Sequence, residues 1–326
     1  MHKAIRIFKD WMLPIAIVTG ISLYLFYYFT PALRPCGGIL HTVASEGQRL
    51  IIALLLFFQF VQISPHDLKL CPWHFRALAF QVAGFLVFGA LSALTPGATG
   101  RILLECAMLC LICPTASAAG VITRKLEGDL AATVTYLVLV NLTATFLIPM
   151  VIPMVRPSAD MGFWSYVARI AMKVFPVLIL PGLLAWLIRY TTHTLQRRLM
   201  RFAPNSFYFW FFGLALAIVL SSHALFMNFP GWGALGGIVL VSAGTCALQF
   251  FAGRRIGRGR SEAITAGQAL GQKNTGFLIW LGYHYLTPVT SVAGGLYAIW
   301  QNLFNSWELY EQAHKGEKEP VSGRPS

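Results

Sequence analysis

Long apolar runs recur along the whole chain, and they restrict its fold more than any other feature of the sequence. Of the 326 residues, 56% are hydrophobic and 11% are charged, against roughly 45–50% and about 25% in ordinary soluble domains. A run of about 20 apolar residues is long enough to cross a bilayer as a helix. Such runs predict ten spans, at 11–30, 47–63, 76–96, 102–122, 130–155, 163–189, 207–227, 231–252, 262–284 and 286–307. We therefore expect an all-α polytopic protein that has the lipid bilayer as its main partner.

The distribution of Lys and Arg predicts the orientation of the chain. The net charge is +13, but the basic residues are spread over many short loops, so nucleic acid is not an expected partner. With a cytoplasmic N-terminus, eighteen basic residues fall on the cytoplasmic side and five on the opposite side. Because cytoplasmic loops carry the excess of Lys and Arg, both termini are predicted to be cytoplasmic, in a multi-pass plasma membrane.

The two ends of the chain are more polar than the spans. Residues 1–10 mix basic and apolar side chains, which predicts a segment lying at the membrane surface. The apolar run that follows is longer than the core of a signal peptide, so an uncleaved first helix is expected. Residues 308–326 have a composition that cannot bury a core, and they are predicted to be a disordered cytoplasmic tail.

The span 102–122 is interrupted near its middle. Pro114 removes a helical hydrogen bond, while Thr115, Ser117 and Gly120 bring small or hydroxyl-bearing residues to the same stretch. Such residues can satisfy freed carbonyl groups or face a ligand. At about 1.5 Å per residue from Ile102, Pro114 lies about 18 Å along the span, near the middle of a hydrocarbon layer of about 30 Å.

The span 262–284 is interrupted at the same depth. Its polar or glycine positions are Gln268, Gly271, Gln272, Lys273, Asn274 and Thr275. A lysine at the bilayer centre costs at least about 2.5–3.5 kcal/mol on insertion scales. Lys273 is therefore the strongest candidate for a functional residue in the chain.

The two interruptions fall at corresponding positions of two halves. Residues 11–155 and 163–307 each contain five predicted spans, and the fourth span of each half is the broken one. Because five is an odd number, the halves would run in opposite senses across the membrane. This pattern is typical of secondary transporters with inverted repeats and a central binding site.

Both interrupted spans resemble those of the bile acid:sodium symporter family. Cys113-Pro114 with its small-hydroxyl stretch, and Gly271-Gln272-Lys273-Asn274-Thr275-Gly276, are similar to the two crossover motifs of that family, and Gln81 falls where the family carries a Gln in its third span. The resemblance implies a bacterial inner-membrane homologue with ten helices, a panel domain and a core domain in which two broken helices cross. It also implies transport of organic anions, either bile-acid-like steroids or small carboxylates, in symport with sodium.

The resemblance implies two sets of site residues. Those expected at the crossover and substrate site are Pro114, Thr115, Ser117, Gly120, Gly271, Gln272, Lys273, Asn274 and Thr275. Those expected to take part in coupling are Lys273, Gln81 and Gln268.

The chain departs from the family pattern where sodium is bound. Ala119 and Gly120 stand at two sodium-ligand positions of the first crossover, and Ala269 and Lys273 replace an acidic residue and a Gln in the second. Two like charges about 4 Å apart repel by about 4 kcal/mol at an effective dielectric of about 20, so sodium and a charged Lys273 should not share the site. We therefore predict a sodium-independent carrier without metal or cofactor, in which Lys273 replaces sodium and either attracts the substrate or completes the crossover.

Two alternatives remain open. A buried lysine can release its proton near neutral pH, so Lys273 could instead couple transport to a proton gradient. The lost sodium ligands would also suit a non-transporting receptor or sensor for organic anions on the same fold. An enzyme is not expected, because the sequence holds no HExxH-type pair, no phosphate-binding Gly-rich loop and no paired carboxylates within a span.

Three further ionisable residues lie in or near the spans. Glu105 is placed within a span, but about 13 Å along the helix from Pro114, too far to be an obvious partner for Lys273. His223 and His284 are predicted near the outer surface, where an interfacial role is more common than a catalytic one.

Overall fold

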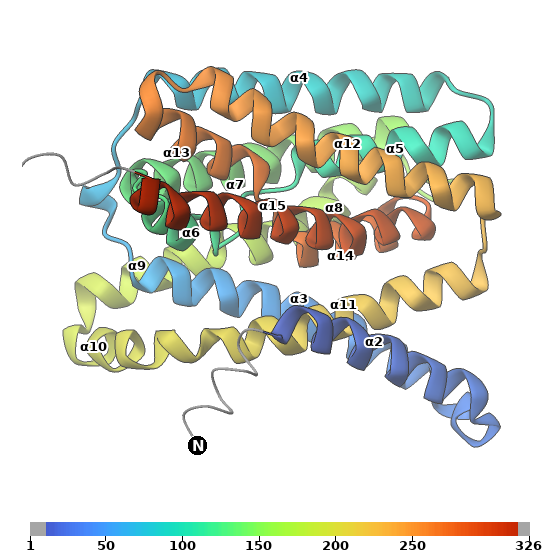
Figure 1. The fold of residues 1–326 in the computed structure, drawn as a ribbon. Helices are drawn as coiled ribbons and strands as arrows, with labels where there is room; N and C mark the ends of the chain where they lie inside the picture. The colour runs from blue at the N-terminus through green and yellow to red at the C-terminus, as the bar shows by residue number, and fades with distance from the viewer. Residues whose placement is uncertain (1–10, 319–326) are drawn as a thin grey trace, which may run out of the picture.

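The fold is seen in a computed structural model that describes residues 11–318 (Figure 1). The prediction of a surface-lying segment at residues 1–10 lies outside the described residues. The helices are α2 Met12–Phe29, η1 Pro31–Cys36, α3 Gly37–Val61, η2 Pro65–Asp67, α4 Pro72–Leu94, α5 Ala98–Ile112, α6 Ala119–Lys125, α7 Leu130–Val155, α8 Phe163–Leu178, α9 Leu180–Thr191, α10 His193–Phe202, η3 Ala203–Asn205, α11 Ser206–Met227, α12 Trp232–Ile256, α13 Gly259–Gly271, α14 Thr275–Tyr285, η4 Pro288–Thr290 and α15 Ser291–Lys318.

Several of these helices have the length and composition of membrane spans. Among the described residues, six qualify: α2, α3 together with η1, α4, α7, α11 and α12. The pair α8 and α9 qualifies as a seventh, bent by 40° at its break. The prediction of an all-α membrane protein is confirmed at this level.

Local sequence sets several of the helix ends. Pro72 and Pro181 stand in the first turns of α4 and α9, where a missing backbone N–H costs nothing. Asp129 caps α7, and its side chain accepts a hydrogen bond from the Ala132 N–H at 3.1 Å. These signals fix where helices begin, whereas tertiary contacts decide how they pack.

The tail prediction is wrong for residues 308–318, because α15 continues through them. Glu308 is buried, forms an ion pair with Arg254 and accepts a hydrogen bond from Gln268. These contacts hold in place a polar segment whose composition alone does not predict a helix. The rest of the predicted tail, residues 319–326, lies outside the described residues.

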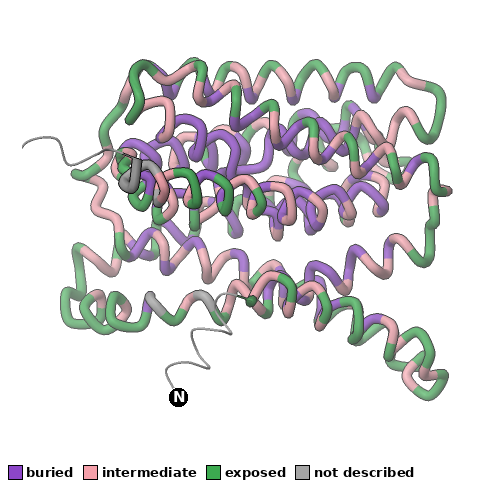
Figure 2. The backbone as a smooth tube through the Cα atoms, viewed as in Figure 1, coloured by how far each residue is buried: buried purple, intermediate pink, exposed green. Residues whose placement is uncertain are grey.

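The helices form two groups that meet along α3 and α11 (Figure 1). The first contains α2, α3, α9, α10 and α11, and the second contains α4, α5, α6, α7, α12, α13, α14 and α15, while α8 contacts α3, α7 and α9. The main hydrophobic cluster includes Leu109, Ile148 and Phe277 of the second group and extends to Ile52 of α3 and Ile170 of α8. Figure 2 shows that the buried stretches gather in the interior of the second group.

The helices α12 and α13 approach closely because glycines line their contact. A Cβ atom on Gly253 would lie 2.4 Å from the Ala266 carbonyl oxygen, and one on Gly271 would lie 2.4 Å from the Phe250 ring. The Phe250 ring is itself stacked on Phe304, with centroids 4.0 Å apart. The end of α13 is therefore held firmly against α12 and α15.

Candidate functional site

Two helices are interrupted in the interior, and their interruptions lie against each other. The segment 113–118 separates α5 from α6, and the segment 272–274 separates α13 from α14. The two segments pair as an antiparallel bridge between Thr115 and Lys273. Both interruptions occur where the sequence predicts them.

Backbone hydrogen bonds join the two segments on either side of this bridge. The Ala116 N–H donates to the Gln272 carbonyl at 3.0 Å, and the Asn274 N–H donates to the Pro114 carbonyl at 2.8 Å. Unpaired backbone groups are costly away from water. Each broken helix therefore supplies partners for backbone groups that the other has freed.

Lys273 lies at the centre of this crossing and is 0% exposed. Its backbone N–H donates to Gln301 Oε1 at 2.8 Å, and its Nζ donates to the Leu111 carbonyl at 3.3 Å. Leu111 is in the last turn of α5, the end of a helix that carries partial negative charge. The ammonium is thus placed to complete the crossover, and Lys273 also belongs to the lining of a cavity beside the crossing.

Gln81 supports the same helix end from α4. Its Nε2 donates to the Ile112 carbonyl at 3.1 Å, and its Oε1 accepts a hydrogen bond from the Tyr136 hydroxyl at 2.8 Å. All of these groups are buried. Gln81 therefore supports the freed Ile112 carbonyl beside the crossing, and its part in coupling stays a prediction.

The second broken helix has its own support, which the sequence reasoning missed. The Tyr297 hydroxyl donates to the Gly271 carbonyl at 2.7 Å. Gln249 Nε2 lies 3.0 Å from that hydroxyl and 3.1 Å from the Cys110 carbonyl, to which it donates. The only signal in the sequence was that Gln249 and Tyr297 are polar residues within predicted spans. The local sequence does not identify the groups to which they form hydrogen bonds.

A hydrogen-bonded chain runs from the crossing towards the end of α15. Gln272 Nε2 donates to Gln268 Oε1, and Gln268 Nε2 donates to Glu308 Oε2 at 2.5 Å. Glu308 is also paired with Arg254. Gln268 thus connects the second crossover to α15 and is not placed against the Lys273 ammonium by any of these bonds.

At two positions that depart from the family pattern, Ala269 and Gly120, neighbouring residues occupy the surrounding space. Ala269 is fully buried, and its carbonyl accepts a hydrogen bond from Thr115 Oγ1 at 2.7 Å. A Cβ atom on Gly120 would lie 2.6 Å from Leu130 Cδ1. The space that a ligating side chain at position 120 would need is therefore occupied by Leu130.

A cavity of about 220 Å³ lies between the two helix groups, next to the crossing. Its apolar wall includes Ile51, Ile52, Leu55, Leu56, Trp210 and Leu214 from α3 and α11. Its polar wall includes Ser117, Gln272, Asn274, Thr275, Gln301, Asn302, Asn305 and Ser306. Five of the predicted site residues, Ser117, Gln272, Lys273, Asn274 and Thr275, therefore line a cavity, together with amides of α15 that were not predicted.

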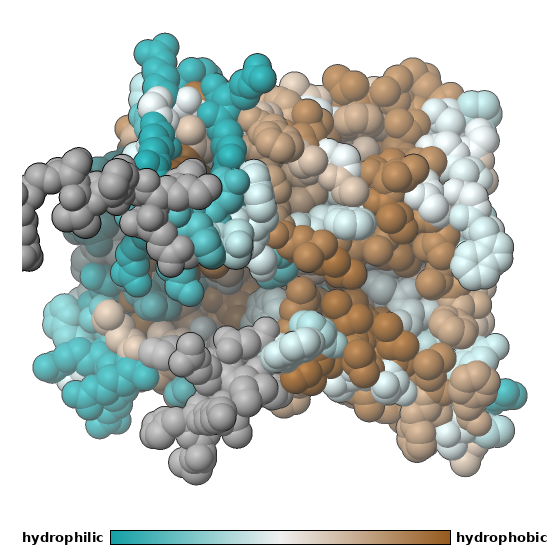
Figure 3. Space-filling view, in the orientation of Figure 1, coloured by the Kyte–Doolittle hydropathy of each residue, from teal (hydrophilic) through white to brown (hydrophobic). Residues whose placement is uncertain are grey.

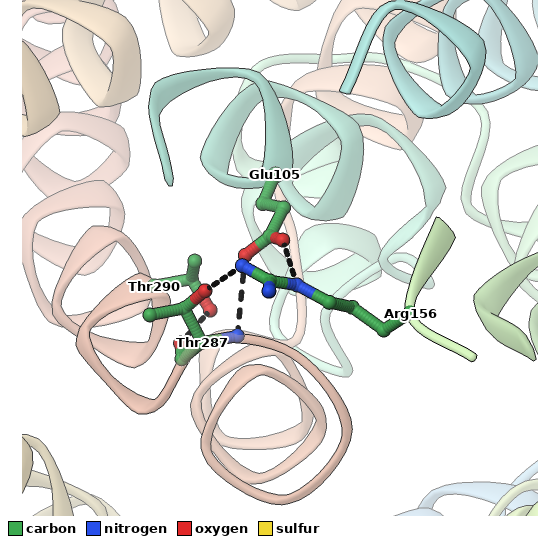
Figure 4. A network of polar contacts seen from close by, with 4 residues as sticks. All are labelled: Glu105, Arg156, Thr287 and Thr290. Carbon is green, nitrogen blue, oxygen red and sulfur yellow. Dashed lines mark hydrogen bonds and ion pairs between the residues drawn. The ribbon is translucent and has the colours of Figure 1, made fainter. Parts of the chain in front are cut away.

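Glu105 takes part in a separate network (Figure 4). Its buried carboxylate accepts hydrogen bonds from Arg156 Nε at 2.6 Å and from the Thr287 N–H at 3.1 Å. Arg156 also donates to Thr287 Oγ1. Glu105 is thus an anchor between α5, the end of α7 and the segment before η4, and its charge partner is Arg156.

Neither protein-family models nor curated proteins give a match for this chain. The relation to the symporter family therefore stays a resemblance carried by the residues of the two crossover segments, Gln81 and the predicted spans.

Proposed function

We propose that this protein is a membrane transporter that moves organic anions by alternating access, without sodium. In this proposal its chain forms ten spans in two inverted repeats. The first two spans of each repeat build a panel domain and the last three build a core domain. The protein would work either as a facilitative carrier or as a secondary active one.

The position of the Lys273 ammonium carries the proposal. In transporters with broken helices, unwound carbonyls and the C-terminal ends of half-helices hold the coupling cation. Here the Leu111 carbonyl at the end of α5 accepts a hydrogen bond from Lys273 Nζ. A covalently attached cation therefore supplies the charge that an exchangeable sodium ion would otherwise bring.

The chemistry of the cavity supports an amphipathic substrate. The aliphatic side chains of α3 would contact an apolar body, and the amides and hydroxyls of the opposite wall would bind polar groups. Thr275 and Gly276, at the positive end of the α14 dipole, also line the cavity. That end suits an anionic group better than a cationic one.

The polar surface supports the predicted orientation. Figure 3 shows hydrophilic side chains gathered at the end of the molecule that carries α10 and the end of α15, beside a hydrophobic surface. The cavity is lined there by Ser306 and Leu309 of α15. We infer that this end faces the cytoplasm and that the structure represents an inward-facing state in a plasma membrane.

Uptake into proteoliposomes tests the proposal. A labelled bile acid and a labelled small carboxylate should enter, or exchange, equally well in sodium and in potassium buffers. A steep dependence on sodium would refute the role given to Lys273. Stabilisation by the same anions in a thermal-shift assay, without uptake or exchange, would favour the receptor instead.

The isolation of Lys273 from carboxylates favours one second candidate, a proton-coupled carrier. The ion pairs between described residues join Arg49 to Glu46, Arg156 to Glu105 and Arg254 to Glu308, and none of them includes Lys273. A lysine without a counter-charge is free to cycle between charged and neutral forms. In that case Lys273→Gln would abolish uptake driven by a pH gradient, whereas a fixed charge predicts lower affinity without a change in pH response.

A further inference from the structure

Side chains from three helices meet on the side of the crossing away from the cavity. His41 of α3 and His223 of α11 each form a hydrogen bond with the hydroxyl of Tyr283 of α14, both at 2.9 Å. Beside them, Ser45 of α3 forms a hydrogen bond with His284 of α14 at 2.7 Å. These contacts fasten one helix group to the other.

The contacts lie in line with the cavity. Along α3, Ile52 lines the cavity, Gln48 donates to the Gly276 carbonyl at 2.7 Å, and Ser45 and His41 follow. His41 and Ile52 are separated by about 16 Å along the helix axis, at about 1.5 Å per residue. The interface between α3 and α14 is therefore hollow at one end and bridged by side-chain hydrogen bonds at the other.

We propose that His41, His223 and Tyr283, together with the Ser45–His284 pair, form a gate that closes the second access route to the cavity and opens in acid. We call this set the histidine–tyrosine gate. The inference rests on the alternating-access part of the proposed function, because only a cavity that opens alternately to both sides needs such a closure.

The hydrogen bonds of the gate suit neutral histidines. His284 Nδ1 lies 2.8 Å from the Trp280 carbonyl, so this nitrogen carries the proton and Nε2 accepts the hydrogen bond from Ser45. The single proton of Tyr283 goes to one of its two histidines, and the other histidine donates to the phenol oxygen. One tautomer of each ring therefore completes the network without any charge.

Protonation would place positive charges close together in this interface. The rings of His41 and His223 have centroids 5.7 Å apart, and His284 follows Tyr283 directly in the chain. The other titratable or charged groups facing the gate among the described residues are Tyr24 of α2, Glu46 and Arg49 of α3, and Tyr285 of α14. Glu46 and Arg49 are paired with each other, so they leave the repulsion between charged histidines largely uncompensated. Repulsion across the contact between α3, α11 and α14 favours separation of the two helix groups.

The test measures access to the cavity and needs no substrate. Ser117→Cys places a thiol in the cavity wall, in a full-length chain carrying Cys36→Ser and Cys71→Ser to remove the less buried native thiols. A membrane-impermeant maleimide is added to right-side-out or to inverted vesicles at several pH values. Labelling from the side of α6 and the end of α15 gives the reference rate at each pH, because the reactive thiolate fraction itself falls in acid. The ratio of the rate from the opposite side to this reference should rise roughly tenfold between about pH 8 and about pH 5, as histidine charges shift the two-state equilibrium.

Variants of the gate distinguish opening caused by histidine charge from opening caused by a weaker interface. His41→Gln with His223→Gln keeps hydrogen-bonding side chains without the titration and should flatten the pH profile. Tyr283→Phe should raise labelling from the gate side already at pH 8. His314→Gln, in a histidine of α15 bonded within its own helix, is the matched control and should keep the original profile.

Two results would overturn the gate. One is a ratio of gate-side labelling to the reference labelling that does not change with pH, and the other is an unchanged profile of this ratio in the double Gln variant of a folded, monodisperse protein. If Tyr283→Phe does not fold, the histidine variants still decide. Because labelling requires no transported anion, failure of the gate is distinguishable from failure of anion uptake.

Discussion

Thr115 and Lys273 pair through their backbones where two helices from opposite halves of the chain are both interrupted. The side chains of Thr115 and Lys273 form hydrogen bonds with different helices. Thr115 Oγ1 donates to the Ala269 carbonyl, and Lys273 Nζ donates to the Leu111 carbonyl. Each side chain thus satisfies the end of a broken helix, Thr115 that of α13 and Lys273 that of α5. The crossing is a closed structural unit that borders the cavity.

Replacement of Lys273 by Met should strongly reduce the proposed transport without unfolding the protein. The substitution removes one hydrogen bond, worth about 1 kcal/mol, and a favourable interaction with the end of α5, worth up to about 2 kcal/mol. It also removes the cost of burying an ammonium, which is several kcal/mol. We expect an unchanged or higher melting temperature and at least a tenfold loss of uptake.

The control for this prediction is Lys173→Met, because Lys173 is an exposed lysine of α8. Its uptake and melting temperature should match those of the unmodified protein. A large fall in stability of Lys273→Met would mean that the ammonium is chiefly structural, and undiminished uptake would mean that transport does not need it.

Gly271→Ala should destabilise the crossing. The added Cβ would lie 2.4 Å from the Phe250 ring, which is stacked on Phe304 and cannot easily move away. Overpacking of this kind costs about 1–3 kcal/mol. Gly276→Ala is the matched control, because its nearest atoms are 3.6 Å away. Thermal unfolding in detergent should show a clear loss for Gly271→Ala and none for Gly276→Ala, and equal losses would contradict the close contact.

The interruptions themselves were predictable, because the signals are local. Proline removes a helical hydrogen bond and can break a helix, although Pro149 and Pro153 stand inside α7 without ending it. A lysine in the middle of an apolar run is a second local signal, because burying its charge in lipid is expensive. Equal depth in two predicted spans indicated a central site between two repeats, whereas the crossing of the broken helices was implied by the family resemblance. The positions Ser117, Gln272 and Asn274, which line the cavity, were also named through that resemblance.

The partners of these residues were not predictable from the sequence. Tyr136, Tyr297 and Gln301 lie in helices whose packing partners are not fixed by an apolar face, because lipid makes most faces of a membrane helix apolar. Glu105 and Arg156 likewise meet only because the middle of α5 packs beside the end of α7. The polar composition around Glu308 also led to a wrong prediction of disorder. The ion pair between the buried Glu308 and Arg254 helps to keep this polar segment helical.

Tyr136→Phe should weaken the hydrogen-bonded support that Gln81 gives to the end of α5. Loss of the hydroxyl leaves Gln81 Oε1 in the interior without its 2.8 Å hydrogen bond, and an unsatisfied buried acceptor costs about 1–3 kcal/mol. Tyr190→Phe provides the comparison, because the Tyr190 hydroxyl contacts His66 at the exposed surface. Its melting temperature should stay close to that of the unmodified protein. If both variants have the same melting temperature, the hydrogen bond between Tyr136 and Gln81 contributes nothing measurable to stability.

Arg156→Met should destabilise the protein through the charge that it leaves behind. The Glu105 carboxylate is fully buried, whereas the Arg156 side chain is 34% exposed. Breaking a buried pair costs about 3–5 kcal/mol, and partial exposure of the arginine lowers the expected loss to about 2–3 kcal/mol. Arg169→Met, in an exposed arginine of α8, should change stability by less than about 0.5 kcal/mol.

A double-mutant cycle identifies the cause of that loss. Adding Glu105→Gln to Arg156→Met removes the stranded charge, while the amide oxygen still accepts from the Thr287 N–H. The double variant should therefore be more stable than Arg156→Met alone, with a coupling energy of at least about 1 kcal/mol. A double variant no better than the single one would show that Arg156 acts through its hydrogen bond to Thr287 and its packing, not by neutralising Glu105.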